Sequence, residues 1–178
     1  MEWKAQIMDE AAVQRSLARI THEIIEKNHG VDHLCLLGVK RRGIPLAQQL
    51  AQNIFRFEGA EVPVGHVDIA LYRDDLTEMG AQPTTLDCDI PCKLADCTVI
   101  IVDDVIYTGR TARAAIDAVF SFGRPKSIQL AVLVDRGHRE LPIRPDYVGK
   151  NIPTSKSEMV SVNVQEIDGE TNVCLYSL

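Results

Sequence analysis

The sequence predicts an α/β domain with a mainly parallel sheet flanked by helices. Three mainly apolar or β-branched runs, at 34–39, 98–102 and 127–134, are typical of strands buried on both faces of such a sheet. The first two runs are each followed by a turn that contains glycine and then by apolar positions at helical spacing. With 178 residues, of which 46% are hydrophobic and 25% charged, the chain suits a single domain over 1–178.

The first predicted helix begins near Glu10, where Asp9 can accept a hydrogen bond from the first turn. Four apolar side chains at helical spacing form a stripe that should face the core: Val13, Leu17, Ile20 and Ile24. Gly30 is placed to end the helix in the left-handed conformation. Another face carries three side chains that form either a plain solvated surface or a cationic ridge: Arg15, Arg19 and His22.

A turn of three cations and a glycine follows the strand at 34–39: Lys40, Arg41, Arg42 and Gly43. The next predicted helix has Pro45 in its first turn. Its apolar positions repeat at helical spacing: Leu46, Leu50, Ile54 and Phe57. Adjacent cations at the carboxyl edge of a sheet can neutralise a diphosphate. Basic turns are common on protein surfaces. This turn therefore indicates a binding site only in combination with a second motif that binds another part of the same ligand.

Between the first two apolar runs the pattern is weaker. Val67, Ile69 and Leu71 alternate with other residues and predict a strand with two different faces. Glycine and prolines then interrupt residues 76–97, which carry little hydrophobic periodicity. We expect a lid or mobile loop over about 72–97. Arg73 is either a residue that meets phosphate charge when this loop closes or a member of a surface salt bridge.

The most informative stretch, 99–112, joins a strand to a helix. Asp103 and Asp104 lie at the carboxyl end of the strand, and Gly109 lies between Thr108 and Thr111 where the helix begins. Paired carboxylates repel phosphate but suit vicinal hydroxyl groups or a metal ion. A helix N-terminus with glycine and hydroxyl groups binds phosphate, and ligands of open α/β sheets lie beyond the carboxyl ends of the strands. The stretch therefore indicates a site for a phosphorylated sugar.

The strand at 127–134 runs into a polar segment with rigid prolines, which predicts a shaped loop over 135–155. Two short β segments follow at 160–164 and 173–176. The turn between them contains Asp168-Gly169, which favours a hairpin.

Several classes of protein are excluded by composition. No run of 18 apolar residues and no apolar signal core occur, so we expect a cytoplasmic chain with no membrane partner. Five cysteines without a C-x-x-C pair favour reduced structural thiols: Cys35, Cys88, Cys92, Cys97 and Cys174. The net charge of −6 argues against general nucleic-acid binding, although it leaves room for a local basic patch.

The stretch 99–111 resembles the phosphoribosyl diphosphate (PRPP) motif of the type I phosphoribosyltransferases, which implies their fold. By this resemblance Asp103 and Asp104 hold the ribose hydroxyls, and the rest of the motif surrounds the sugar and its 5′-phosphate: Val105, Ile106, Tyr107, Thr108, Gly109, Arg110 and Thr111. The turn 40–43 matches the family's pyrophosphate loop. The resemblance implies a catalytic role for the acid pair and for two arginines, Arg41 and Arg73.

The resemblance also implies a small hood over about 135–160 and a flexible loop over about 72–97. The base would contact the hood through four residues: Val134, Asp135, Arg136 and Ile152. Asp135 lies where relatives bind a water of the Mg²⁺ ion that accompanies PRPP. Many purine transferases place a third aspartate where this chain has Tyr107, and an unperturbed tyrosine is a poor base at neutral pH. We therefore assign no general base.

Three further sequence segments, at 71–76, 135–144 and 149–158, are more specific than the PRPP motif, because they indicate a subfamily. They resemble a subfamily of bacterial attenuators of the pyrimidine operon that have uracil phosphoribosyltransferase activity. This resemblance implies that uracil is the base and that UMP or UTP promotes binding to leader mRNA. A basic surface could hold the RNA: Arg15, Arg19, His22, Lys27, Arg144 and Lys150. Such a surface needs a homo-oligomer, from dimer to hexamer, to become large enough. The alternative is a transferase for uracil or another base without the RNA role.

Overall fold

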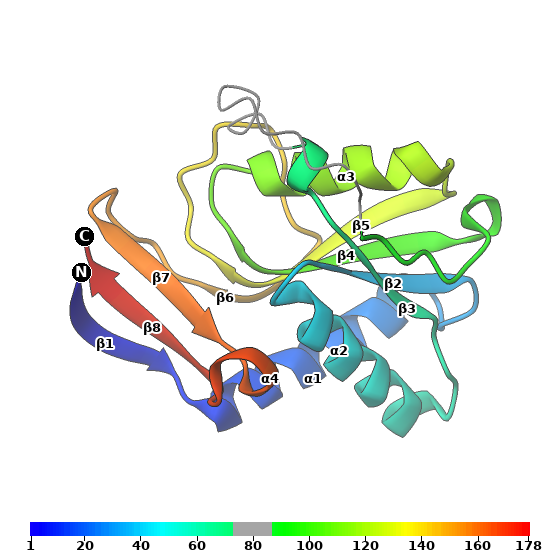
Figure 1. Cartoon of the computed structure of the whole chain (residues 1–178). Coiled ribbons are helices and arrows are strands. Elements are labelled where there is room, and N and C mark those ends of the chain that lie inside the picture. The colour runs from blue at the N-terminus through cyan, green and yellow to red at the C-terminus, as the bar shows by residue number, and fades with distance from the viewer. Residues whose placement is uncertain (73–86) are drawn as a thin grey trace.

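Two sheets form the framework of the protein (Figure 1). The computed structural model describes residues 1–72 and 87–178. The large sheet has the order β3-β2-β4-β5-β6, with all neighbouring strands parallel: Val64–Val67, Leu34–Val39, Thr98–Ile106, Ser127–Asp135 and Tyr147–Asn151. The small antiparallel sheet has the order β1-β8-β7: Glu2–Met8, Asn172–Ser177 and Glu158–Asn163. The predicted α/β class with a mainly parallel sheet is therefore confirmed.

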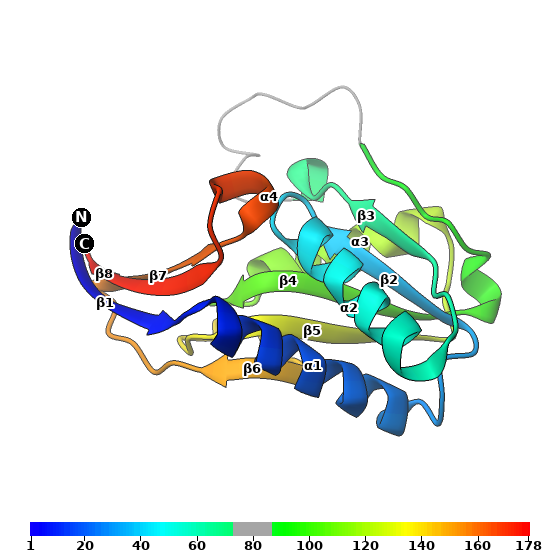
Figure 2. The ribbon, with the colours of Figure 1, turned by 90° about the horizontal axis from the view of Figure 1, so that it is seen from below.

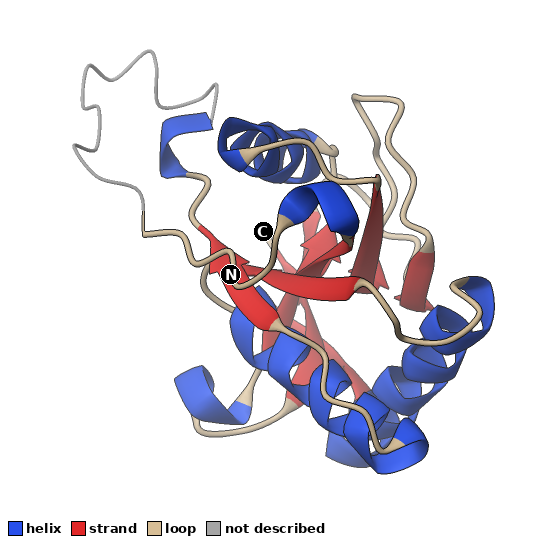
Figure 3. Cartoon of the chain, turned by 90° about the vertical axis from the view of Figure 1, so that its right-hand side faces the viewer, coloured by secondary structure: helices blue, strands red, loops and turns tan. Residues whose placement is uncertain are grey.

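Helices cover both faces of the large sheet (Figures 2 and 3). Helices α1 (Glu10–Lys27) and α2 (Gly43–Glu58) enclose one hydrophobic core with the strands, and α3 (Arg110–Phe122) encloses a second core on the opposite face. A short helix, α4 (Gln165–Asp168), connects β7 to β8. No helix within the described residues is long and apolar enough to cross a membrane.

The first helix follows its sequence signals closely. Asp9 accepts a hydrogen bond from the Ala12 amide at 2.8 Å, and the four stripe residues are buried, as predicted. At the other end His29, with φ of 53°, takes the left-handed position that was expected for Gly30. In α2 the predicted apolar positions are buried except for Phe57, which is partly buried and stacks on His22 with ring centres 4.3 Å apart.

The structure corrects three predictions of strands and turns. The strand expected at 67–71 lies instead at Val64–Val67, because the Asp68 carboxylate accepts a hydrogen bond from the Ala70 amide at 3.0 Å and turns the chain. Strand β4 continues through the acid pair to Ile106. The predicted hairpin forms, but α4 and the left-handed Gly169 replace a two-residue turn. Strand β1, which had no sequence signal, completes the small sheet.

Residues 73–86 of the expected loop over 72–97 lie outside the described residues, and the expected hood over 135–160 includes strands of both sheets. Arg73 lies outside the described residues. Residues 87–97 pack on the second core, with Leu94 and Cys97 buried. In the hood range, β6 belongs to the large sheet and β7 to the small one.

All five cysteines are free. Burial raises the pKa of the Cys35 thiol and raises that of Cys97 to about 11, and the neighbouring Cys92 adds to both shifts. Thiols with raised pKa values remain protonated at neutral pH. This agrees with the predicted reduced, structural role.

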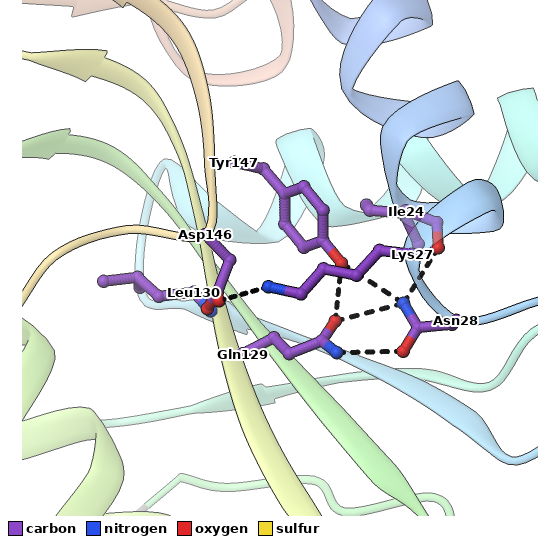
Figure 4. A network of polar contacts seen from close by, with 7 residues as sticks. All are labelled: Ile24, Lys27, Asn28, Gln129, Leu130, Asp146 and Tyr147. Atoms are coloured by element: carbon purple, nitrogen blue, oxygen red, sulfur yellow. Dashed lines mark hydrogen bonds and ion pairs between the residues drawn. The ribbon is translucent and has the colours of Figure 1, made fainter.

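A polar network joins the end of α1 to β5 and β6 (Figure 4). The Asn28 side chain donates to the Ile24 carbonyl at 2.8 Å, and its amide exchanges hydrogen bonds with the amide of Gln129. The Tyr147 hydroxyl donates to Gln129 Oε1 at 2.7 Å. Every polar side-chain atom buried in the described residues has a partner, so the network fixes α1 against the sheet without unsatisfied groups.

Candidate functional site

The carboxyl ends of β2, β4 and β5 meet along one edge of the large sheet. The strand register pairs Gly38 with Val102 and Ile106 with Asp135. The basic turn 40–43 also packs directly on β4, since a Cβ atom built on Gly43 would lie 2.3 Å from the Val102 carbonyl oxygen. Only glycine allows this approach. The basic turn, the acid pair and Asp135 are therefore brought to one place by the backbone, as the sequence predicted.

The acid pair is held by its own backbone. Asp103 Oδ1 accepts a hydrogen bond from the Asp104 amide at 2.9 Å, and Asp104 Oδ1 accepts one from the Val105 amide at 2.7 Å. Burial and the negative charge of Asp104 raise the pKa of the Asp103 carboxyl well above its usual range. The two carboxylates thus form a preorganised but electrostatically costly pair, which is typical of a binding site.

This cost leads to a prediction about stability. The folded chain holds the Asp103 proton more tightly than the unfolded chain does, so stability falls as pH rises through the interval between the two pKa values. Asp103→Asn removes this loss and should raise the melting temperature at neutral pH by about 2–4 °C for each 1 kcal/mol recovered. The gain should vanish below about pH 4, where the carboxyl is protonated in both states. Thermal unfolding at several pH values tests this, and a gain that is equal at all pH values would contradict the explanation.

A cavity of about 120 Å³ lies beside the acid pair, where β4 passes into α3. Its lining includes the following residues: Asp103, Val105, Ile106, Tyr107, Thr108, Gly109, Thr111 and Ala112. Gly109 precedes α3 with φ of 94°, and the Thr108 hydroxyl accepts a hydrogen bond from the Arg110 amide at 3.3 Å. The first amides of α3 and its dipole favour an anion at this end of the cavity.

Residues 136–141, which follow β5, form a strap over this turn. The Glu140 amide donates to the Thr108 carbonyl at 2.9 Å. Arg139 donates to the Tyr107 carbonyl at 2.8 Å and to Asp135 Oδ2 at 2.7 Å. Arg139 was not among the predicted site residues. Only its position four residues after Asp135 pointed to a possible ion pair.

Side chains of the strap contact one part of the Tyr107 ring, and 37% of Tyr107 remains exposed. The guanidinium carbon of Arg136 lies 4.0 Å from the centre of its ring, and the ring of His138 meets it edge-on at 5.8 Å. Arg136 is itself buried and donates to the Thr154 hydroxyl at 3.1 Å. The predicted base-binding residues differ in burial. Three of the four are buried: Val134, Arg136 and Ile152. The fourth, Asp135, is partly buried.

The three cations of the basic turn have different surroundings. Lys40 lies 2.8 Å from Asp87 Oδ2. Arg42 forms two hydrogen bonds to Asp168. Arg41 has no hydrogen bond or ion pair with residues 1–72 and 87–178. The sequence predicted these cations as one group, and the structure separates them.

The structure gathers only part of the predicted basic surface. Arg15, Arg19 and Lys150 line one open groove of about 420 Å³ between α1 and β6. Arg19 also donates to the Val148 carbonyl at 3.2 Å. The other three predicted residues do not line this groove, and two of them have defined partners: His22 stacks on Phe57, and Lys27 pairs with Asp146 at 2.6 Å. The remaining residue, Arg144, is exposed in the segment before β6.

Comparisons with known proteins point to one family of proteins. The family model described as phosphoribosyl transferase domain matches residues 4–167. A protein of Clostridium acetobutylicum named bifunctional protein PyrR is 59% identical over 178 residues, covering 100% of both chains. A protein of Thermus thermophilus with the same name is 57% identical over 176 residues, covering 99% of this chain and 97% of that protein.

Solved structures show the same fold at low sequence identity. A hypoxanthine phosphoribosyltransferase from Trypanosoma cruzi, in a ternary complex with substrates, matches with a TM-score of 0.75 and 21% identity over 97% of this chain and 94% of that chain. A hypoxanthine-guanine phosphoribosyltransferase from Bacillus anthracis matches with a TM-score of 0.73 and 20% identity over 100% of both chains.

Proposed function

The chain belongs to the phosphoribosyl transferase domain family and, within it, to the PyrR proteins, and on this premise we propose that it has two functions. It converts uracil and PRPP into UMP and diphosphate. It also binds the leader mRNA of a pyrimidine operon in response to UMP or UTP and thereby attenuates transcription. The observation that carries the first function is the acid pair beside the anion-binding end of α3.

The acid pair and the phosphate turn position the sugar. The carboxylates of Asp103 and Asp104 accept hydrogen bonds from the ribose hydroxyls, and their negative charge favours positive character at C1′ as the bond to diphosphate breaks. The turn 108–111 binds the 5′-phosphate, which lies away from the bond that breaks. Binding energy from this remote group holds the reacting carbon in place.

Charge on the departing diphosphate is balanced at the basic turn. Arg41, which has no hydrogen bond or ion pair with the described residues, is the direct contact, and the turn that carries it packs on β4 at Gly43, next to the acid pair. We keep Arg73 as a second contact, although it lies outside the described residues. Because no third aspartate is present and Tyr107 is packed under Arg136, uracil enters the reaction as its anion.

Mg²⁺ fits the site as an ion that arrives with PRPP. Both oxygens of Asp135 already accept hydrogen bonds, from the Gly137 amide at 3.0 Å and from Arg139 at 2.7 Å. Their remaining lone pairs suit a contact through water, which is how Mg²⁺ commonly meets protein carboxylates. The acid pair offers a second set of oxygens on the sugar side. When bound, the ion supplies charge that stabilises the leaving diphosphate.

The groove between α1 and β6 is the proposed RNA surface. Arg15 and Lys150 are exposed there and have no acidic partner in the described residues. Cations that neutralise phosphates supply most of the sequence-independent affinity for RNA. One groove of this size covers few phosphates, so we propose a homo-oligomer that places several grooves side by side.

Two assays test the proposal. Incubation with PRPP, Mg²⁺ and a panel of bases should give product with uracil in clear preference to orotate and purines. Titration of pyrimidine leader RNA with the protein, with and without UMP and at two salt concentrations, should show binding that UMP strengthens and salt weakens. UMP formation without RNA binding under any condition would leave a plain uracil phosphoribosyltransferase, and preference for another base would refute the substrate assignment.

A further inference from the structure

We propose that Arg42 and Asp168 form a clamp that sets the position of the diphosphate turn, so that Arg42 is a positioning residue and not a ligand of the diphosphate. The inference rests on the proposed transfer reaction and changes the role expected for one of its three cations. It also gives the C-terminal segment a part in the reaction.

The contact between the two side chains is bidentate. Arg42 Nε lies 3.1 Å from Asp168 Oδ2, and Arg42 Nη2 lies 2.7 Å from Asp168 Oδ1. Oδ2 of Asp168 also accepts a hydrogen bond from the Val164 amide at 2.9 Å. Both side chains are partly shielded from solvent, with 37% of Arg42 and 18% of Asp168 exposed. Paired geometry of this kind is directional and stronger than a simple surface ion pair.

The clamp connects the two sheets. Arg42 is the last residue before α2, and Asp168 ends α4, which links β7 and β8 of the small sheet. Figure 2 shows α4 beside the loop that leads into α2. A chain segment more than a hundred residues away from the turn therefore holds it from one side.

A second anchor holds the opposite side of the turn. Lys40 pairs with Asp87, and its amide donates to the Val67 carbonyl of β3 at 3.0 Å. Gly43 packs directly on β4 at the Val102 carbonyl. Arg41 lies between these anchors. The arrangement presents one cation to the ligand and uses its two neighbours to fix the backbone.

The charges of Arg42 and Asp168 neutralise each other. Hydrogen bonding to Asp168 raises the pKa of Arg42, and the same contact lowers the pKa of Asp168. Both groups stay ionised across the neutral range and neutralise each other. Arg42 therefore offers little free charge to an incoming diphosphate, whereas a misplaced turn would weaken the contact that Arg41 makes.

Asp168→Asn is the decisive variant. It should raise both KM for PRPP and the dissociation constant of magnesium diphosphate, measured by calorimetry, by about tenfold, while KM for uracil changes less than twofold. Asp168→Glu should restore part of the affinity. Lys4→Gln, which breaks an ion pair with Glu158 inside the small sheet, is the matched control and should change neither constant.

The opposite result is equally clear. If Arg42 were a ligand, Asp168→Asn would release it, and affinity for diphosphate would stay the same or increase; that outcome overturns the clamp. Arg42→Lys gives a second test, since it keeps the charge but cannot form the paired contact. The clamp requires it to behave like Asp168→Asn, and wild-type affinity would again overturn the clamp. The diphosphate measurement tests the clamp even if the wild-type chain makes no UMP. Absence of UMP formation would refute the proposed transferase activity but would not refute the clamp.

Discussion

Asp104→Asn is expected to lower kcat/KM for PRPP by about 10²–10³-fold, the effect usual for loss of one preorganised group at a charged transition state. The substitution preserves size but removes the negative charge beside C1′ and turns one oxygen that accepts hydrogen bonds into a donor. Asp104 lies at the carboxyl edge of β4, next to the phosphate turn, where its carboxylate is oriented by the Val105 amide. Initial rates at varied PRPP measure the loss.

The control for this variant is Asp117→Asn, which makes the same change on α3 in an ion pair between helix neighbours. It should leave the kinetics unchanged. Melting temperatures distinguish loss of chemistry from loss of fold, because Asp104→Asn relieves the repulsion with Asp103 and should not destabilise the chain. Wild-type kinetics for Asp104→Asn would remove the acid pair from the mechanism.

Arg15→Glu is expected to weaken binding of leader RNA by at least about tenfold at low salt, and to reduce the salt dependence of binding by about one charge. Arg15 lies on the exposed face of α1 in the groove shared with Lys150, away from the acid pair and the phosphate turn. UMP synthesis should therefore remain at the wild-type rate. We prefer Arg15 to Arg19 for this test, because Arg19 also holds the backbone of β6 at Val148.

Arg124→Glu provides the matched control for RNA binding. It makes the same change in net charge at an exposed residue just beyond the end of α3, the helix that covers the opposite face of the large sheet. Equal RNA affinity for Arg15→Glu and wild type would locate the RNA elsewhere. Equal losses for both variants would mean that overall charge, and not the groove, governs binding.

Local sequence determined the central part of the candidate site. Asp103 and Asp104 lie in the carboxyl-terminal part of the buried strand β4, and Gly109, between two threonines, precedes the next helix. Because parallel strands end at a common edge, the basic turn after β2 was predicted to meet this stretch, and the register of β2 and β4 confirms it. These features depend on residues close together in the chain, whose conformations follow from hydrophobic periodicity and helix-end chemistry.

The tertiary structure alone decided which charged groups are paired. Arg42 meets Asp168, Lys40 meets Asp87, and β1 joins β8, although no periodicity or motif indicates any of these contacts. Partners distant in sequence meet only after the order of strands in both sheets is established, and each ion pair depends on the geometry of two backbones. The sequence by itself therefore determined which kind of ligand the strand ends can bind. Packing between the sheets decided which cation remains available to bind that ligand.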